Sequence, residues 1–287
     1  MNTINSPKSS PSSSSLPSLD RTFTLSRELT SEQISFLDAY GFLHFRGVLS
    51  PEEVALVARV QDELERRWLD QGIDELRGVP IFYGPGLEDR EVSYRLPFCS
   101  EHSPELRALL NDVRFEPIKA LVGEDVRIGH DEQDGVVMNR YVNAVGSVRP
   151  GLGWHTDGLR DLFYLRRPQQ MLNFGLHLDR ITAAEGGLRL LPGTHRQGLL
   201  AMMFRKPYFI SHKPDRHEVA VETLPGDMTV HDGRLWHRVA QNQTPGTQRR
   251  SLYVPYMTGP PVVRQEGSKP LLYHRLGRWS RIRKGGR

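Results

Sequence analysis

The sequence has almost no cysteine and no long apolar run. Cys99 is the only cysteine among 287 residues, so no internal disulfide and no cysteine-rich zinc site can form. Its apolar runs extend over a few residues only, far short of the ~20 that a membrane-spanning helix needs. The first 20 residues also lack the apolar middle of a secretory signal. These absences exclude a membrane span and favour a cytoplasmic location.

An excess of positive charge is also missing from most of the chain. The net charge is +4, but residues 274–287, HRLGRWSRIRKGGR, contain six Arg or Lys and no acid. Without these six, the other 32 of the 38 basic residues are fewer than the 34 acidic residues. The body of the protein is therefore not basic, and nucleic acid is not expected as a partner.

The composition and the apolar pattern along the chain predict three regions. Residues 1–20 hold eight serines and three prolines without apolar periodicity, which predicts a disordered tail, because such a segment cannot bury enough apolar surface to offset its ordering entropy. Residues 21–262 are predicted to form a single domain, with a helical part over about 30–120 and a β-barrel over about 125–257. A basic segment, 263–287, follows.

The first part of this domain carries two helix signatures. TSEQISFLDAYG predicts a short helix that Thr30 or Ser31 caps and Gly41 ends. In SPEEVALVARVQDELERRW, Ser50 is the expected N-cap of a longer helix and Glu53 closes a capping box. Apolar residues then recur every three or four positions, as the buried face of an amphipathic helix requires.

Short β-rich runs broken by Gly and Pro follow after about residue 125. They are VVMNRYV, QMLNFGLHL, GLRLLPG, DMTVHD and RSLYVPYM. Many short strands with turn signals and no helical patterns between them favour a barrel or sandwich over a parallel α/β sheet. The sequence thus predicts a mainly β fold with flanking α, in which N-terminal helices pack on a β-barrel.

A candidate metal site lies in GWHTDGLRD, residues 153–161. The spacing of His155 and Asp157 places both on one side of an extended segment. Two His and one carboxylate on one face of an octahedron are the ligands of non-haem Fe(II) oxygenases. The third ligand would come from elsewhere, and the candidates are His177, His195, His212, His217, His231 and His237. A pair at this spacing often arises by chance, and on its own it favours polar residues at a turn over a metal site.

Four stretches in order decide between these interpretations, because together they resemble the phytanoyl-CoA dioxygenase family of Fe(II)- and 2-oxoglutarate-dependent oxygenases. They are YGFLHFRGVLSPEE, HTD at 155–157, LDRITAAEGGLRLLPGTHRQG and PGDMTVHDGRLWHRVAQNQTPGTQRRSLYVPY. The resemblance covers most of residues 38–257. It implies a double-stranded β-helix, the jelly-roll or cupin-like fold.

The resemblance also implies a ligand set. His155 and Asp157 match the family's proximal iron ligands, and His237 matches the distal ligand, with Asn242 five residues later as in the family pattern. His231 is the competing candidate for the distal position. An intact set argues against the alternative hypothesis, a catalytically inactive jelly-roll protein that only binds a metal or a ligand.

An arginine on the family's last strand binds the distal carboxylate of 2-oxoglutarate, and this sequence offers Arg249 and Arg250. Adjacent strand residues face opposite ways, so only one can enter the barrel. The distance to Tyr256 favours Arg249, although its separation from His237 is one residue longer than usual and leaves Arg250 open. Two strand residues, Asn139 and Asn173, offer side-chain amides that could also bind the co-substrate, although ordinary strand residues without this role are an equal alternative.

Two loops are candidates for contact with the substrate. One follows the metal motif, GLRDLFYLRRPQQ, and the other is the irregular stretch 199–217. Loops at the mouth of a rigid barrel commonly form the specific pocket, although ordinary surface loops are an equal alternative. The side chains selected are Arg160, Met203, Phe204 and Tyr208.

The activity that the resemblance implies is oxidation of an unactivated C–H bond of a small molecule, usually hydroxylation. Fe(II), 2-oxoglutarate and O₂ are the cofactor and co-substrates, and succinate and CO₂ are released. Asp157 argues against halogenation, because related halogenases have a small residue there. An acyl-CoA, a carboxylated metabolite and a natural-product intermediate all remain candidate substrates, and the sequence does not indicate the oligomeric state.

Overall fold

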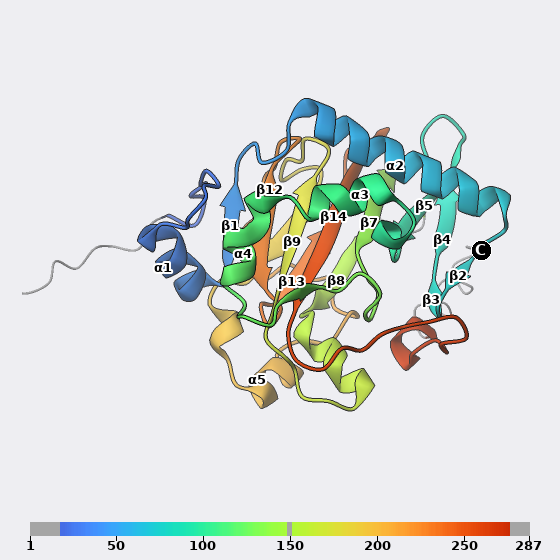
Figure 1. The fold of residues 1–287 in the computed structure, drawn as a ribbon. Coiled ribbons are helices and arrows are strands. Elements are labelled where there is room, and N and C mark those ends of the chain that lie inside the picture. The colour runs from blue at the N-terminus through green and yellow to red at the C-terminus, as the bar shows by residue number, and fades with distance from the viewer. Residues whose placement is uncertain (1–17, 148–150, 276–287) are drawn as a thin grey trace, which may run out of the picture.

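Two antiparallel β-sheets form the centre of the computed structural model, which describes residues 18–147 and 151–275 (Figure 1). Residues 1–17 of the predicted disordered tail lie outside the described residues. So do residues 276–287 of the predicted basic segment.

Helices surround the sheets, and residues 272–275 at the end of the described chain are also helical. The α-helices are α1 (Ser31–Tyr40), α2 (Pro51–Asp70), α3 (Pro104–Leu110), α4 (Glu116–Ala120) and α5 (Leu199–Phe204). The 3₁₀ helices are η1 (Cys99–Glu101), η2 (Val113–Phe115), η3 (Gly158–Tyr164) and η4 (Thr194–Arg196). Within residues 18–147 and 151–275, no helix combines the length and the apolar character that crossing a membrane requires.

Both predicted helix signatures are confirmed. Thr30 caps α1 through a capping box with Gln33, and Gly41 ends the helix in the left-handed conformation at φ 83°. Ser50 caps α2 in the same way, with Glu53 as its partner. Its buried face includes Val57, Val60, Leu64 and Trp68.

The larger sheet has eight strands. Its order is β1 (Phe42–Phe45), β12 (Met228–Asp232), β9 (Met171–His177), β14 (Thr247–Met257), β7 (Val137–Asn143), β5 (Glu91–Leu96) and β4 (Phe82–Pro85), with β6 (Arg127–Ile128) paired to β14. Helix α2 lies across this sheet over the ends of β14, β7 and β5 (Figure 1). On α2, Glu65 accepts a hydrogen bond from the Ser93 amide of β5 at 2.9 Å and lies 3.3 Å from Arg140 of β7.

The smaller sheet has four strands. Its order is β11 (Val219–Ala220), β10 (Gly187–Leu190), β13 (His237–Ala240) and β8 (Leu152–His155). A separate hairpin consists of β2 (Glu75–Leu76) and β3 (Val79–Pro80). All five β-rich runs recognised in the sequence contain a strand. Four of these strands belong to the larger sheet and one, β10, to the smaller sheet, whose other three strands lie outside the five runs.

The predicted mainly β, jelly-roll fold with flanking helices is confirmed, but one detail differs: the sheets do not close into a barrel. Among the described residues, no strand ladder joins the larger sheet to the smaller one. Closure depends on hydrogen bonds between edge strands. A sequence pattern records only which residues alternate between two faces.

The two faces of the larger sheet have different roles. On β7, Arg140 points toward α2, whereas its neighbours Asn139 and Tyr141 line a cavity shared with the smaller sheet. Because side chains alternate along a strand, one face packs under the N-terminal helices and the other is available for chemistry. The main apolar core lies on the helical side and includes Phe36, Trp68, Phe115 and Phe174.

Candidate metal centre

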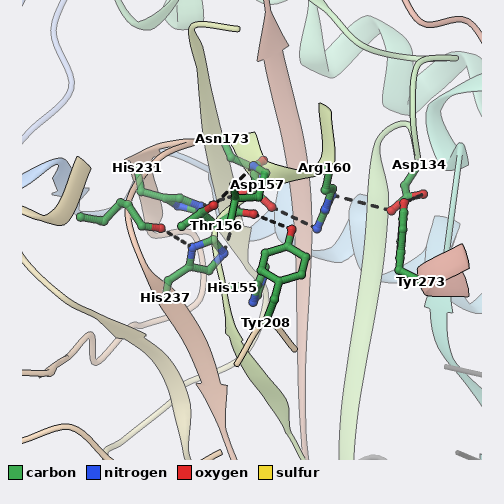
Figure 2. A network of polar contacts seen from close by, with 12 residues as sticks. Asp134, His155, Thr156, Asp157, Arg160, Asn173, Tyr208, His231, His237 and Tyr273 are labelled. Atoms are coloured by element: carbon green, nitrogen blue, oxygen red, sulfur yellow. Dashed lines mark hydrogen bonds and ion pairs between the residues drawn. The ribbon is translucent and has the colours of Figure 1, made fainter. Parts of the chain in front are cut away.

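His155, Asp157 and His237 come together at one end of the smaller sheet. His155 is the last residue of β8 and His237 the first of β13, and the two are direct partners in the antiparallel register. Asp157 follows two residues after β8. One potential ligand atom from each residue lies within 4.8 Å of the others, and all three side chains are buried. Figure 2 shows the three side chains converging from the two strands.

Both imidazole rings are oriented by hydrogen bonds to the backbone. Nδ1 of His155 lies 2.8 Å from the carbonyl oxygen of Gly153, and Nδ1 of His237 lies 2.9 Å from that of Leu235. A carbonyl oxygen only accepts, so Nδ1 carries the proton in each ring and Nε2 keeps a lone pair for a metal. Burial lowers the pKa of both rings, that of His237 to about 4, so both are neutral at pH 7.

The carboxylate of Asp157 receives donors on both oxygens. The Asn173 amide donates to Oδ2 at 3.0 Å, and the Arg160 guanidinium lies 3.0 Å from Oδ1. Burial alone would raise the pKa of Asp157. The positive charge of Arg160 opposes this effect, and a hydrogen bond from the His231 ring adds to it. Together they hold the pKa of Asp157 well below its usual value. Asp157 is therefore ionised and pre-oriented.

His231, the competing candidate for the distal ligand, lies beside the centre on β12. Its Nε2 is 3.2 Å from Oδ2 of Asp157. An ionised carboxylate only accepts, so Nε2 of His231 carries a proton and has no lone pair for a metal. The geometry thus places His231 behind Asp157 and favours His237 as the distal ligand.

A cavity between the two sheets opens onto these three residues. The larger sheet contributes Asn139, Tyr141, Met171, Asn173, Tyr253, Pro255 and Met257, and the smaller sheet contributes Leu152, Leu188 and Val239. Additional lining residues come from the loop before β7 and from η3. Apart from the three metal-site residues, the charged part of the lining consists of Arg95, Glu132, Asp134 and Arg160 and is called the outer part below.

Arg249 and Arg250 occupy opposite faces of β14, as strand geometry requires. The Arg249 guanidinium lies over the Tyr141 ring, 4.7 Å from its centroid, and Tyr141 lines the cavity. The Arg249 guanidinium donates hydrogen bonds to the backbone carbonyl oxygen of Ala240, at 2.5 Å, and to that of Glu185. Arg250 lies on the helical side and forms an ion pair with Asp179 at 2.8 Å. Only Arg249 faces the region between the sheets.

The two candidate amides lie in different positions. Asn139 lines the cavity from β7, two residues before Tyr141 and on the same face of the strand. Asn173 also lines it, but its amide nitrogen donates to Asp157. The structure therefore connects Asn173 directly to the metal-binding carboxylate.

The four candidate substrate residues separate into two pairs. Arg160 lines the cavity, and the Tyr208 hydroxyl donates to the Thr156 carbonyl oxygen at 2.8 Å, one residue before Asp157. Met203 and Phe204 lie on α5 with 38% and 78% of their surface exposed, and neither belongs to the cavity lining among the described residues. The structure brings only Arg160 and Tyr208 to the centre.

Sequence reasoning missed several residues around the centre. Phe209 stacks on the His155 ring with 4.6 Å between centroids, because residues 209–211 hydrogen-bond along the edge of β8. Asp134 forms contacts with Tyr273 and His274, which come from the end of the described chain. No local pattern signals these contacts, since the partners lie far apart in the sequence.

The fold and the buried group together define a class of protein. It is a jelly-roll protein with a mononuclear metal centre of two imidazoles and one carboxylate. The family model for phytanoyl-CoA dioxygenase (PhyH) matches residues 37–251, and the chain belongs to this family. The predicted membership is confirmed, and all three metal-site residues lie within the match.

Individual relatives agree with this assignment. The chain is 25% identical over 233 residues to dioxygenase af480 of Aspergillus fumigatus. This alignment covers 80% of this chain and 70% of that protein. Among solved structures, the non-heme alpha ketoglutarate dependent carbocyclase SnoK from nogalamycin biosynthesis has 19% identity and a TM-score of 0.61, covering 90% of this chain and 93% of SnoK. HygX of Streptomyces hygroscopicus, with nickel and 2-oxoglutarate bound, has 19% identity and a TM-score of 0.58, covering 80% and 87%. The predicted cofactor class, iron with 2-oxoglutarate, agrees with these findings.

Proposed function

We propose that this protein is an Fe(II)- and 2-oxoglutarate-dependent dioxygenase that hydroxylates an unactivated C–H bond of a small molecule. The observation that carries the proposal is the buried group of His155, Asp157 and His237. Two neutral imidazoles and one carboxylate suit ferrous iron and leave coordination positions open for co-substrate and O₂. The solved relative HygX has also been crystallised with iron bound.

Arg249 fits the binding of the 2-oxoglutarate distal carboxylate. Burial lowers the pKa of its guanidinium to about 10, and its Nε is buried without a hydrogen-bond partner in the described part of the chain. Its hydrogen bonds go to carbonyl oxygens, and no carboxylate of the described residues lies within ion-pair distance. A buried cation without an anion is costly, and a carboxylate bound by its planar fork would offset that cost.

The residues around the centre hold the metal-binding side chains in place and shield the centre from water. Bound iron, 2-oxoglutarate and O₂ would supply the oxidising chemistry, with succinate and CO₂ as co-products. Tyr208 and Phe209 lie against the Asp157 and His155 side of the centre, where they exclude water. Asn173 and His231 hold Asp157 in the orientation that coordination requires.

Hydroxylation is the outcome that we favour among the possible oxidations. The name of SnoK, a carbocyclase, shows that a relative of the same fold catalyses a different reaction. Asp157 occupies the position at which a halogenase has a small residue, so halogenation is not supported. The alternative of an inactive binding protein is disfavoured because all three ligands and Arg249 are in place.

We further propose that residues 21–262 form the catalytic domain and that the protein acts in the cytoplasm on a small molecule. The match to the family model lies entirely within this range. The basic residues concentrated in 274–287 leave the rest of the chain without the positive excess typical of nucleic-acid-binding proteins.

Anaerobic addition of Fe(II) and 2-oxoglutarate tests the proposal. The expected result is the weak visible charge-transfer band of an iron–2-oxoglutarate chelate, which requires both additions and disappears in Asp157→Ala. Exposure to O₂ should then convert 2-oxoglutarate to succinate. Absence of both the band and succinate in the wild-type protein would support the inactive binding protein instead.

A further inference from the structure

Arg160 lies between two carboxylates in the lining of the cavity. One of its terminal nitrogens is 3.0 Å from Oδ1 of Asp157, and the other is 3.7 Å from Oδ2 of Asp134 (Figure 2). The first contact is a close ion pair, and the second is a longer one. Nε of Arg160 is buried and has no hydrogen-bond partner among the residues that the structure describes. The guanidinium thus retains unused donors inside the cavity.

Asp134 does not offset the charge of Arg160, because it already has closer partners. Arg95 lies 2.8 Å from its Oδ2. The Tyr273 hydroxyl and Nε2 of His274 lie 3.1 and 3.0 Å from its Oδ1. Two guanidinium groups therefore share one carboxylate in the outer part of the cavity.

The charges of the loaded centre do not balance without one more anion. Bound Fe(II), dianionic 2-oxoglutarate, Arg249 and Asp157 sum to zero. The outer part adds the two cations Arg95 and Arg160 and the anion Asp134, all of which line the cavity. A further lining carboxylate, Glu132, is already paired with Arg127 at 2.6 Å and leaves the sum unchanged. One positive charge is left over, and a buried charge without a partner is unfavourable.

Another part of the cavity lining is apolar. Met171 on β9 and Pro255 and Met257 on β14 line the same cavity. A ligand that satisfies both parts of the lining carries one anionic group and an apolar body. A neutral polyol would leave the apolar part of the lining unused, and a neutral hydrocarbon would leave the remaining positive charge of the loaded centre unbalanced.

We propose that Arg160 binds the carboxylate of the substrate, and that the substrate is a small monocarboxylic acid with an apolar body. The inference rests on the proposed function, because it takes the metal and the co-substrate to be bound at their sites. It assigns Arg160 a role in specificity beyond its contact with Asp157.

The test uses straight-chain carboxylates from butanoate to octanoate, with the primary amides of the same lengths as neutral controls. The protein is loaded with Ni(II) and saturating 2-oxoglutarate, so that neither the metal nor Arg249 is free to bind the probe. Dissociation constants are measured by ligand-observed NMR. Each acid is expected to bind at least tenfold more tightly than its amide. Each methylene that reaches the apolar part of the lining should tighten binding by about fourfold.

Three variants locate this preference. Arg160→Gln should abolish the advantage of acid over amide, and Arg160→Lys should keep part of it. Arg167→Gln is the matched control, since Arg167 is exposed on the same loop and the charge change is identical. It should behave as the wild type.

The outcomes separate this inference from the proposed function. Acids without advantage over amides in the wild type overturn the inference, including the case in which neither series binds. So does an Arg160→Gln variant that loses nickel and 2-oxoglutarate binding as strongly as acid binding, because Arg160 would then only position Asp157. Failure of the wild-type protein to bind 2-oxoglutarate with Ni(II) would instead contradict the proposed function.

Discussion

Nε2 of His231 donates a hydrogen bond to Oδ2 of Asp157, 3.2 Å away, although the two residues are 74 positions apart in the chain. The pairing of β12 with β9 brings them together, because His231 lies opposite Asn173 in the register, and Asn173 donates to the same oxygen. The metal-binding carboxylate is thus oriented by the larger sheet, while both histidine ligands come from the smaller sheet. The relative position of the two sheets therefore determines the geometry of the centre.

Replacing His231 should weaken metal binding without abolishing it. His231→Leu removes the donor to Asp157, and loss of such an orienting contact typically costs about 10- to 100-fold in metal affinity. His231→Gln keeps an amide donor and should lose less. Isothermal titration calorimetry with Ni(II) measures the metal affinity of both variants. If His231→Leu abolished binding as completely as His237→Ala, His231 would be a ligand.

Asp157→Ala should abolish succinate formation from 2-oxoglutarate. The substitution removes one of three metal ligands and leaves Arg160 without its counter-ion. Asp232→Ala is a suitable control, because Asp232 is a nearby carboxylate that pairs with Arg234 instead. Its succinate production should match the wild type. Wild-type rates in Asp157→Ala would contradict the assignment of the metal centre.

The two neighbouring arginines should respond differently to the same substitution. Arg249→Gln should raise the KM for 2-oxoglutarate by roughly 10- to 100-fold, the effect of losing charge-assisted hydrogen bonds. Arg250→Gln should leave this KM unchanged and lower the melting temperature, because it breaks the pair with Asp179 on the helical side. The KM is obtained from succinate production at varied 2-oxoglutarate. The reverse pattern would assign the co-substrate to Arg250.

Asp227 should make the stability of the fold depend on pH. Burial raises the pKa of this carboxyl, but four hydrogen bonds lower the pKa by more than burial raises it, and the result is a pKa of about 2. The donors are the side chains of His44 and Arg46 and the backbone amides of Leu224 and Gly47. A depressed pKa stabilises the folded state above the unfolded pKa, and this contribution disappears as the pH falls from about 4 toward 2.

Asp227→Asn should therefore lower the free energy of unfolding by about 2 kcal/mol at pH 7 and by about half as much near pH 3. Urea unfolding at both pH values measures the difference. Asp38→Asn is the control, because the Asp38 side chain is 73% exposed. A destabilisation of Asp227→Asn that is equal at both pH values would show that its carboxylate charge is not the cause.

Local sequence patterns predicted the elements of the fold well. The capping box of Ser50 and Glu53 and the apolar repeat through Trp68 involve contacts within a few residues, so spacing alone reveals them. The same holds for His155 and Asp157, which a two-residue spacing on an extended segment places on one side. His237 lies 80 residues beyond Asp157 and was found only through the family resemblance.

Contacts between distant segments were not predictable in this way. The stacking of Phe209 on His155 depends on the path of an irregular loop along the edge of β8. The contacts of Tyr273 and His274 with Asp134 depend on where the chain returns after β14. In both cases the interacting groups have ordinary local sequence contexts, and no periodicity links them.

The sequence by itself determined the two N-terminal helices, five of the strands, the ligand types and their family order, because these follow from local spacing and from residue chemistry. Only the tertiary structure decided that Arg249 rather than Arg250 faces the space between the sheets, and that His231 donates to Asp157 rather than offering a lone pair. It also decided that the sheets stay open. The physical reason is that hydrogen bonds and ion pairs require atoms within about 3–4 Å, and sheet pairing sets these distances between residues far apart in the chain.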